Sequence, residues 1–497
     1  MESSSRFSLS SYSLSKALLR VAVIVILSAG IAIAQSAAGS HAQLLQLVDQ
    51  NAPHWKEVSK QIWDYAELGY HETKSSDLLQ EQLKAAGFRV QAGVADEPTA
   101  FIASYGEGKP VVAILGEFDA LPGLSQQTVP TKDPVKAGAP GHGCGHNLLG
   151  SGAALAAVSL KQYMESHHMP GTLRYYGTPA EEGGSGKVYM VRAGAFKDVD
   201  VVLQWHPGTE NSVANGGQLA VASAKFTFHG TAAHAAMAPD RGRSALDAVM
   251  LMGTGVEYLR EHVPSNTRIH YIISKGGVAP NIVPDLAQID LMARSPFNST
   301  LQEVWERIQK IAQGAVLMTG TTLEVKSIGG DANIIPNDPL AARAQKNLEE
   351  VGGYTLDPDQ KKFAEQLQKT FGMDTPPSLD ATKQIEPLKK FDPNAPMAST
   401  DVGDVSWNVP TIGFSAATWP AGTAAHTWQA AATSGMSIGQ QGMVVAAKAI
   451  ALTALDLFTD PALVQAAKDD FKKQLAGKSY YTAIPADQKP LINYRND

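Results

Sequence analysis

The sequence predicts an α/β protein that has a mainly parallel central sheet and a second, smaller domain inserted into it. The chain has 497 residues, which is long enough for more than one domain. Up to residue 216, apolar strand-like runs alternate with helical runs, as in a parallel sheet covered by helices. From residue 217 to 330 the order becomes β-α-β-β-α-β, which is the order of a ferredoxin-like unit.

The first part of the larger domain covers residues 43–216 and begins with helices, because apolar residues recur at helical spacing between Leu44 and Phe88. Strands are expected next at residues 99–105 and 110–119. The second of these is largely apolar, as a strand buried on both faces should be. The later elements are helices at residues 148–166 and 186–194 and strands at residues 173–178 and 200–206.

The inserted domain, residues 217–330, contains the six elements of the ferredoxin-like order. They are expected at residues 219–229, 244–262, 268–275, 286–294, 300–317 and 322–328. The larger domain resumes at residues 331–497. There a polar, proline-containing stretch at residues 354–396 precedes a long alanine-rich helix at about residues 440–458.

Composition favours a small-molecule partner. Hydrophobic residues make up 44% of the chain and charged residues 18%, which is typical of a globular protein. The formal net charge of −7 opposes a general affinity for nucleic acid or for anionic lipid. We therefore expect no nucleic-acid partner and no lasting contact with a membrane.

The N-terminus resembles a signal peptide over residues 1–34. A serine-rich, basic segment precedes the uncharged run Val21–Ala34, which is short for a membrane span of about 20 residues. Ala32 and Ala34 supply a small-x-small cleavage site. We expect export to the periplasm or secretion, with an uncleaved anchor as the alternative.

The strongest local signal is the segment GHGCGHN, residues 141–147, which holds a thiol and two imidazoles among glycines. Cys144 is the only cysteine, so an intramolecular disulfide is excluded. Thiolate and imidazole are ligands that zinc prefers. A nucleophilic cysteine paired with a histidine, and an inert buried cysteine, are the alternatives.

Polar residues follow the predicted strands where each strand ends. Glu117 and Asp119 follow the first buried strand, Glu181 and Glu182 follow a later one, and His206 ends another. Open α/β sheets place their sites at this edge. Two adjacent carboxylates can divide the tasks of binding a metal and holding a proton.

Eight strings extend these observations over most of the chain, in order from about residue 44 to 455. They are GEFDALPGL, GHGCGHNLLG, AEEGGSGK, QWHP, HGTAAHAAMAPDRGRSALDAV, PNIVPD, STDVGDVSW and GTAAHTWQ. In these strings the chain resembles the dinuclear-metal aminoacylase and carboxypeptidase superfamily of amidohydrolases. Within it, the chain is most similar to the aminobenzoyl-glutamate hydrolase branch.

The resemblance implies two divalent metal ions, zinc or manganese. The implied ligands are Cys144, His146, Glu182, His206 and His426. It further implies that Glu181 is the general base and that Asp119 orients a ligand. Glu117 stands where many relatives carry a metal-binding histidine, so the occupancy of the second metal position is open.

For the inserted domain the resemblance implies a lid and a dimerisation surface. His234 matches a histidine that reaches the active site of the partner subunit of a homodimer and stabilises the oxyanion. Asn281 and Arg294 match positions that bind the substrate carboxylate. A further, different subunit is also possible.

We therefore predict an exported, metal-dependent amidohydrolase that cleaves N-acyl or N-aroyl amino acids, with glutamate conjugates favoured. The alternatives are a dipeptidase or aminoacylase of other specificity, a thiol hydrolase in which Cys144 attacks carbon, and a non-catalytic binding protein. His142, Asp401 and Asp404 lie in or beside the motifs without an assigned role.

Overall fold

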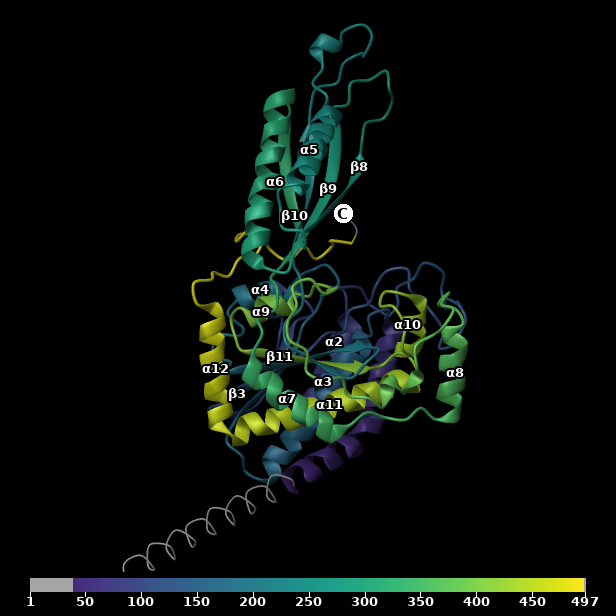
Figure 1. Ribbon diagram of the computed structural model, residues 1–497, viewed down its shortest axis with the longest axis vertical. Helices are drawn as coiled ribbons and strands as arrows, with labels where there is room; N and C mark the ends of the chain where they lie inside the picture. The colour runs from purple at the N-terminus through teal and green to yellow at the C-terminus, as the bar shows by residue number, and fades with distance from the viewer. Residues whose placement is uncertain (1–38, 496–497) are drawn as a thin grey trace, which may run out of the picture.

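A computed structural model describes residues 39–495 of the chain (Figure 1). The predicted signal peptide at residues 1–34 lies outside these residues. The chain forms a broad lower body built on a seven-stranded sheet and a narrow upper body built on a four-stranded sheet (Figure 1). The predicted α/β class is confirmed.

The larger sheet has the strand order β1-β2-β4-β3-β5-β11-β6. Its strands are β1 (Arg89–Ala92), β2 (Phe101–Glu107), β3 (Val111–Gly116), β4 (Gly171–Gly177), β5 (Val201–Gly208), β6 (Ser212–Ala214) and β11 (Thr411–Ala417). The four central strands β4, β3, β5 and β11 run parallel. The outer strands β1, β2 and β6 pair antiparallel. Because the four central strands are parallel, their carboxyl ends meet at one edge of the sheet.

Helices cover both faces of this sheet. One face packs against α3 (His146–Ser166), α7 (Asp338–Val351) and α11 (Ser437–Thr459), and the other against α4 (Gly186–Arg192) and α9 (Val402–Ser406). All six residues of β3 are buried, because Val112 and Ile114 face one apolar core while Ala113 and Leu115 face the other.

Helix α11 is long and apolar enough to cross a membrane by length and composition alone, but 83% of its most apolar window is buried within the protein. It packs on α3, α7 and β11. Gly442 allows this close approach, because a Cβ atom there would lie 2.3 Å from the carbonyl oxygen of Ala417. The apolar sequence of α11 is therefore explained by the core.

The upper body is an antiparallel sheet with the order β10-β7-β9-β8, covered on one face by two helices. Its elements are β7 (Ala220–His229), α5 (Ala245–Arg260), β8 (Arg268–Lys275), β9 (Leu286–Ser295), α6 (Asn298–Thr319) and β10 (Thr322–Asp331). Side chains alternate along β7: Ala224 and Phe226 pack under the helices, whereas Ser223 and Lys225 lie on the opposite, open face. We call this unit the inserted domain.

The remaining helices complete the larger domain. They are a helix at residues 39–65, α2 (Thr73–Ala85), α8 (Pro358–Gln368), α10 (Trp428–Ser434) and α12 (Pro461–Leu475). Helix α8 lies in the stretch for which the sequence analysis expects no element. It begins at a capping box in which the side chains of Asp357 and Gln360 each bond to the other's backbone N–H.

Residues 476–495, which we call the C-terminal strap, run from α12 across the base of the inserted domain (yellow in Figure 1). Tyr480 Oη donates to Asp404 Oδ1 at 2.7 Å in the larger domain. Thr482 Oγ1 donates to the carbonyl oxygen of Gly330 in the inserted domain at 2.9 Å. The strap therefore joins the two domains.

Candidate metal centre

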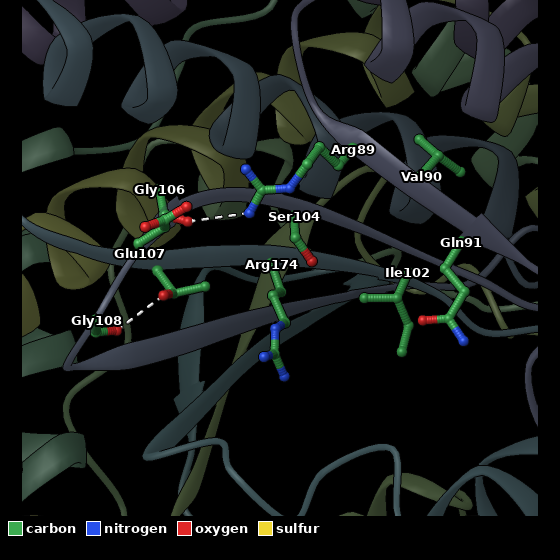
Figure 2. A pocket seen from close by; sticks show the side chains of 10 residues that line it. Arg89, Val90, Gln91, Ile102, Ser104, Gly106, Glu107, Gly108 and Arg174 are labelled. Carbon is green, nitrogen blue, oxygen red and sulfur yellow. Dashed lines mark hydrogen bonds between the residues drawn. The ribbon is translucent and has the colours of Figure 1, made fainter.

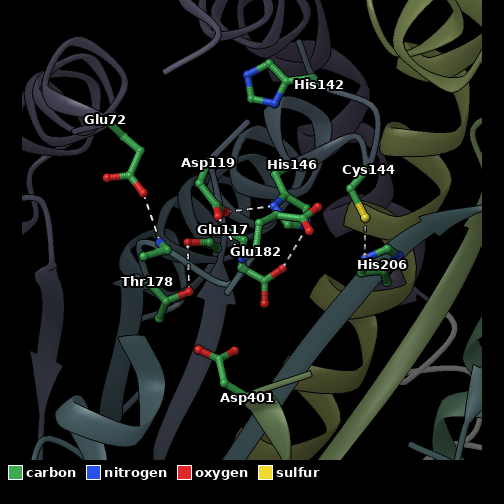
Figure 3. Close-up of polar contacts among 12 residues, drawn as sticks. Glu72, Glu117, Asp119, His142, Cys144, His146, Thr178, Glu182, His206 and Asp401 are labelled. Atoms are coloured by element: carbon green, nitrogen blue, oxygen red, sulfur yellow. Dashed lines mark hydrogen bonds and ion pairs between the residues drawn. The ribbon is translucent and has the colours of Figure 1, made fainter. Parts of the chain in front are cut away.

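Side chains from the carboxyl ends of the central strands converge at one edge of the larger sheet (Figure 3). Glu117 and Asp119 follow β3, Glu182 follows β4, and His206 lies near the end of β5. The loop before α3 brings Cys144 and the start of the helix to the same place (Figure 3).

Two residues in these loops have backbone conformations that the site requires. Gly145, with φ of 76°, lies against Pro207, and a Cβ atom at this glycine would lie only 2.9 Å from that ring. His426 has a φ of 61°, which is rare for a residue with a side chain. Its backbone N–H donates to the carbonyl oxygen of Gly143 at 2.9 Å, which fixes His426 against the cysteine loop.

The potential ligand atoms fall into three groups, and the atoms of each group lie within 4.8 Å of one another. The groups are Cys144–His146–His206, Cys144–Glu182–His426 and Glu117–His146–Glu181. The five ligands implied by the sequence therefore come together. Cys144 belongs to two of these groups, so its sulfur is a candidate ligand in both.

The donor atoms fit divalent metal ions. Among residues 39–495, the buried atoms Glu117 Oε2, His146 Nε2 and Glu182 Oε1 have no hydrogen-bond partner. Such atoms are costly to bury unless a cation satisfies them. Cys144 Sγ lies 3.5 Å from Nε2 of His206, and His426 Nε2 lies 3.4 Å from Oε1 of Glu182. Thiolate, imidazole and carboxylate together are a donor set that zinc accepts.

Hydrogen bonds behind the ligands hold them in orientation. His146 Nδ1 donates to Asp119 Oδ1 at 2.8 Å, which leaves Nε2 directed toward the cluster (Figure 3). Asp119 Oδ2 also accepts from the backbone N–H of Glu182 at 2.9 Å. His206 Nδ1 donates to the carbonyl oxygen of Pro207 at 2.7 Å, so its Nε2 is also free to bind.

The adjacent carboxyl groups of Glu181 and Glu182 have different environments. Burial raises the pKa of Glu181 well above its usual value, and the nearby charges of Glu117 and Glu182 raise it further. Burial also acts to raise the pKa of Glu182, but the close contact with His426 and the charge of His146 outweigh it and lower that pKa. One carboxyl group can therefore hold a proton while its neighbour remains a charged ligand.

The surroundings of Cys144 disfavour a nucleophilic thiol. Burial raises its pKa far above the usual value, and the charge of Glu182 adds to this effect. A nucleophilic cysteine needs the opposite shift. A bound cation would deprotonate the thiol, so Cys144 suits a metal ligand.

His142 is buried beside the cluster but belongs to none of the three ligand groups. Its Nε2 donates to the carbonyl oxygen of Ile62 at 3.0 Å. Burial lowers its pKa to about 3, so the ring is neutral. His142 therefore anchors the cysteine loop to the helix at residues 39–65.

Glu117 is tied to a lysine that the sequence analysis does not single out. Lys187, at the start of α4, is fully buried, and its Nζ lies 2.7 Å from both Glu117 Oε1 and Asp401 Oδ1. The other carboxylate oxygen of Glu117 lies 3.3 Å from His146 Nε2. Glu117 thus faces the cluster with one oxygen. Asp401 supplies a second negative charge beside the buried Lys187.

A cavity of about 600 Å³ opens in front of the cluster, between the two domains. We call it the active-site cavity. The larger domain contributes Cys144, Glu181, Glu182, His206 and His426, the inserted domain contributes Val221, Ser223, Lys225, Met292 and Arg294, and the strap contributes Tyr494 and Arg495. Arg294, for which the resemblance implies binding of the substrate carboxylate, lines this cavity from the inserted domain.

The strap residues were missed because they lie far from every motif. Tyr494 Oη donates to the backbone carbonyl of Glu182 at 3.3 Å, and the guanidinium of Arg495 donates to the same carbonyl. The Tyr494 ring packs edge-on against Tyr70. These contacts support the turn that carries both glutamates.

His234 and Asn281 do not line the active-site cavity of their own chain. Both side chains are exposed in the inserted domain. Their backbones lie side by side. Ala235 N–H donates to the carbonyl oxygen of Asn281 at 3.0 Å, and His234 forms an isolated antiparallel β-bridge with Ile282. The structure thus separates this pair from the ligand cluster.

Another cavity, of about 400 Å³, lies on strands β1, β2 and β4 (Figure 2). Its two arginines are engaged: Arg174 forms two bonds to Asp198, at 2.7 and 2.6 Å, and Arg89 donates to the carbonyl oxygen of Gly106. Neither histidine nor cysteine lines this cavity.

A buried set of thiol, imidazole and carboxylate groups at the strand ends of an α/β sheet, facing a cavity under a second domain, defines a metal-dependent hydrolase. The chain belongs to peptidase family M20/M25/M40, whose pattern matches residues 113–375. It is a hydrolase of amide bonds, and the resemblance found in the sequence is confirmed.

Two relatives and one solved structure illustrate which proteins the chain is similar to. The chain is 39% identical to one subunit of p-aminobenzoyl-glutamate hydrolase of Escherichia coli (strain K12), over 89% of this chain and 97% of the relative. It is 32% identical to Xaa-Arg dipeptidase of Mus musculus, over 86% and 91%. The fold matches the crystal structure of an aminobenzoyl-glutamate utilization protein from Klebsiella pneumoniae, with a TM-score of 0.60, 19% identity, and coverage of 83% and 98%.

Proposed function

We propose that the protein hydrolyses the amide bond of N-acyl or N-aroyl amino acids, with glutamate conjugates as the favoured substrates, and that it uses two divalent ions, zinc or manganese. The observation that carries this proposal is the sharing of Cys144 by two ligand groups beside Glu181. The Escherichia coli relative, named as part of a p-aminobenzoyl-glutamate hydrolase, supports the choice of substrate.

Bound divalent ions would polarise the amide carbonyl and lower the pKa of a water molecule. The residues of the chain perform the remaining tasks. Glu181 accepts a proton from the attacking water and returns it to the leaving nitrogen. Arg294 binds the carboxylate of the substrate from the opposite wall.

A panel of amide substrates tests this proposal. Purified protein, with its metal content measured, is incubated with N-aroyl and N-acyl amino acids and with dipeptides, and the products are read by mass spectrometry. We expect hydrolysis that a chelator abolishes and that added zinc or manganese restores. Hydrolysis that survives complete removal of the metal would contradict the proposal.

We further propose a homodimer through the inserted domain. Strand β8 is an edge strand of its sheet, with Ile272 65% and Ile273 44% exposed, and such an edge is commonly covered. His234 and Asn281 lie outside their own active-site cavity, which suits a role in the site of a partner subunit.

Mixing two inactive variants tests this arrangement. A mixture of His234→Ala and Glu181→Gln should regain part of the activity, because a mixed dimer holds one site with both residues intact. Chains labelled with two tags report subunit exchange. Exchange without recovered activity at any mixing ratio would contradict the shared site.

Export and a second kind of subunit complete the proposal. Residues 1–34 support export to the periplasm or secretion. The Escherichia coli relative is named as one subunit of its hydrolase, which supports a different partner chain for this protein too. N-terminal sequencing and native mass of the protein from its own source would test both, and a retained Met1 in a soluble cell fraction would contradict export.

A further inference from the structure

A second cavity, of about 370 Å³, lies beside the active-site cavity and shares Arg294 with it. We call it the outer cavity. It lies on the open face of strands β8 and β9, opposite a loop of the larger domain at residues 393–397. Its lining residues are Leu219, Asn266, Arg268, His270, Arg294, Pro393, Asn394, Ala395, Pro396 and Met397. No acidic residue is among them.

Two arginines face each other across this cavity floor. Arg268 on β8 pairs directly with Arg294 on β9 in the strand register. Side chains in this relation have Cβ atoms about 4.5–5.5 Å apart, and like charges placed there destabilise a sheet. Within residues 39–495 neither guanidinium forms a salt bridge that would offset the repulsion. His270, two residues further along β8, lies on the same face.

The existing hydrogen bonds of the two arginines leave donors available. Arg268 Nη1 donates to the carbonyl oxygens of Ser265 and Thr267, at 2.6 and 3.0 Å, which holds the side chain at the start of β8. Arg294 Nε contacts Met292 Sδ at 3.2 Å. A guanidinium carries five N–H donors, so most remain free to bind an anion.

This concentration of cations is unusual for a chain with a net charge of −7. The geometry points to an anion subsite: we propose that the outer cavity takes a second carboxylate of the substrate, namely the side-chain carboxylate of an acidic amino acid whose α-carboxylate Arg294 binds. The inference rests on the proposed function and deepens it. A glutamyl group carries two carboxylates on a short chain, which matches two adjacent arginines.

The subsite distinguishes the chain from one that releases arginine. A cationic side chain entering the outer cavity would meet Arg268 and Arg294, and no acidic residue lines that cavity. A carboxylate would instead receive charge-assisted hydrogen bonds from planar guanidinium groups. Acidic conjugates are therefore selected over Xaa-Arg dipeptides by both attraction and repulsion.

The matched substrates N-aroyl-glutamate and N-aroyl-glutamine test the subsite, because they have the same shape and differ by one charge. We expect wild-type protein to favour the glutamate conjugate in kcat/KM by roughly 10- to 100-fold, as hydrogen bonds to a charged group allow. Arg268→Gln and, separately, His270→Gln should lower this ratio toward one, mainly by raising KM for the glutamate conjugate.

Arg89→Gln is the matched control, because Arg89 lines the unrelated cavity on β1. It should leave the ratio unchanged. A wild-type ratio near one would overturn the subsite. So would variants that keep the wild-type ratio, with Arg268→Gln losing activity equally on both substrates and His270→Gln leaving the ratio unchanged. If no N-acyl amino acid is hydrolysed, the proposed function fails. In that case, calorimetry measures the binding of the same two compounds. Tighter binding of the glutamate conjugate supports the subsite, and equal binding overturns it.

Discussion

The ligand cluster at the strand ends and the open face of the inserted domain use opposite chemistry. The cluster gathers acids, imidazoles and one thiol in a buried place, whereas the open face presents Arg268, Arg294 and Lys225 to the cavities. Buried anionic donors require a cation of matching charge. Arg268 and Arg294 line the outer cavity, where a substrate can reach them. This contrast fits the proposal that the larger domain cleaves the bond and the inserted domain selects the substrate.

The largest expected effect is on catalysis and comes from Glu181. Replacement by Gln should lower kcat by roughly two to four orders of magnitude, as loss of a general base does. Bound metal should remain, since Glu181 belongs to neither group that contains Cys144. Steady-state kinetics and elemental analysis measure the two outcomes. Loss of metal in this variant would break the division between base and ligand.

The next effect is on stability and comes from Lys187. Lys187→Met leaves Glu117 and Asp401 buried without their cation, and should lower the free energy of unfolding by about 3–5 kcal/mol. The control is Lys109→Met, which should cost less than about 1 kcal/mol, because Lys109 is exposed and its partner Asp200 keeps Lys468. Denaturant titration compares the variants. If the two variants lose the same unfolding free energy, the buried contacts of Lys187 contribute no more to stability than those of the exposed Lys109.

A smaller effect is expected at the strap. Tyr494→Phe removes the hydrogen bond to the carbonyl of Glu182, and should lower kcat/KM by about fivefold. Tyr258→Phe, on an exposed tyrosine of α5, is the control and should have no effect. If both variants match wild-type kinetics, the strap does not support the glutamate turn.

The smallest expected effect is a pH dependence of the free energy of unfolding, and it comes from His41. Hydrogen bonds to Asp456 and Glu350 raise the pKa of His41. The stabilisation is therefore complete below the unfolded pKa of about 6.5 and is lost as pH rises through the folded pKa. His41→Gln should remove a pH-dependent contribution of about 0.5–1 kcal/mol. Unfolding at pH 6 and pH 9 measures it, and an identical pH dependence in both proteins would refute it.

The sequence predicts local features well and distant partners poorly. The strand ends at Glu117, Glu182 and His206 are visible because the buried strands are continuously apolar and stop at polar residues. Helix α8 was missed because its polar surface hides a weak apolar repeat, although the capping box at Asp357 could have located it.

The missed site residues share another cause. Lys187 pairs with Asp401 across 214 positions of sequence, and Tyr494 reaches Glu182 across 312. Neither pair has a local signature, because the contacts depend on how α4, α9 and the strap pack. The cross-strand pair Arg268–Arg294 likewise needs the register of β8 and β9, which sequence periodicity does not fix.

The central claim is that Cys144 binds metal between two cation positions and does not attack the substrate. The most direct measurement combines elemental analysis of the purified protein with intact-protein mass spectrometry during turnover. The account predicts two divalent ions per chain in the wild-type protein, loss of metal in Cys144→Ala, and an unmodified chain mass throughout. An acyl adduct on Cys144, together with activity that survives chelation, would contradict it.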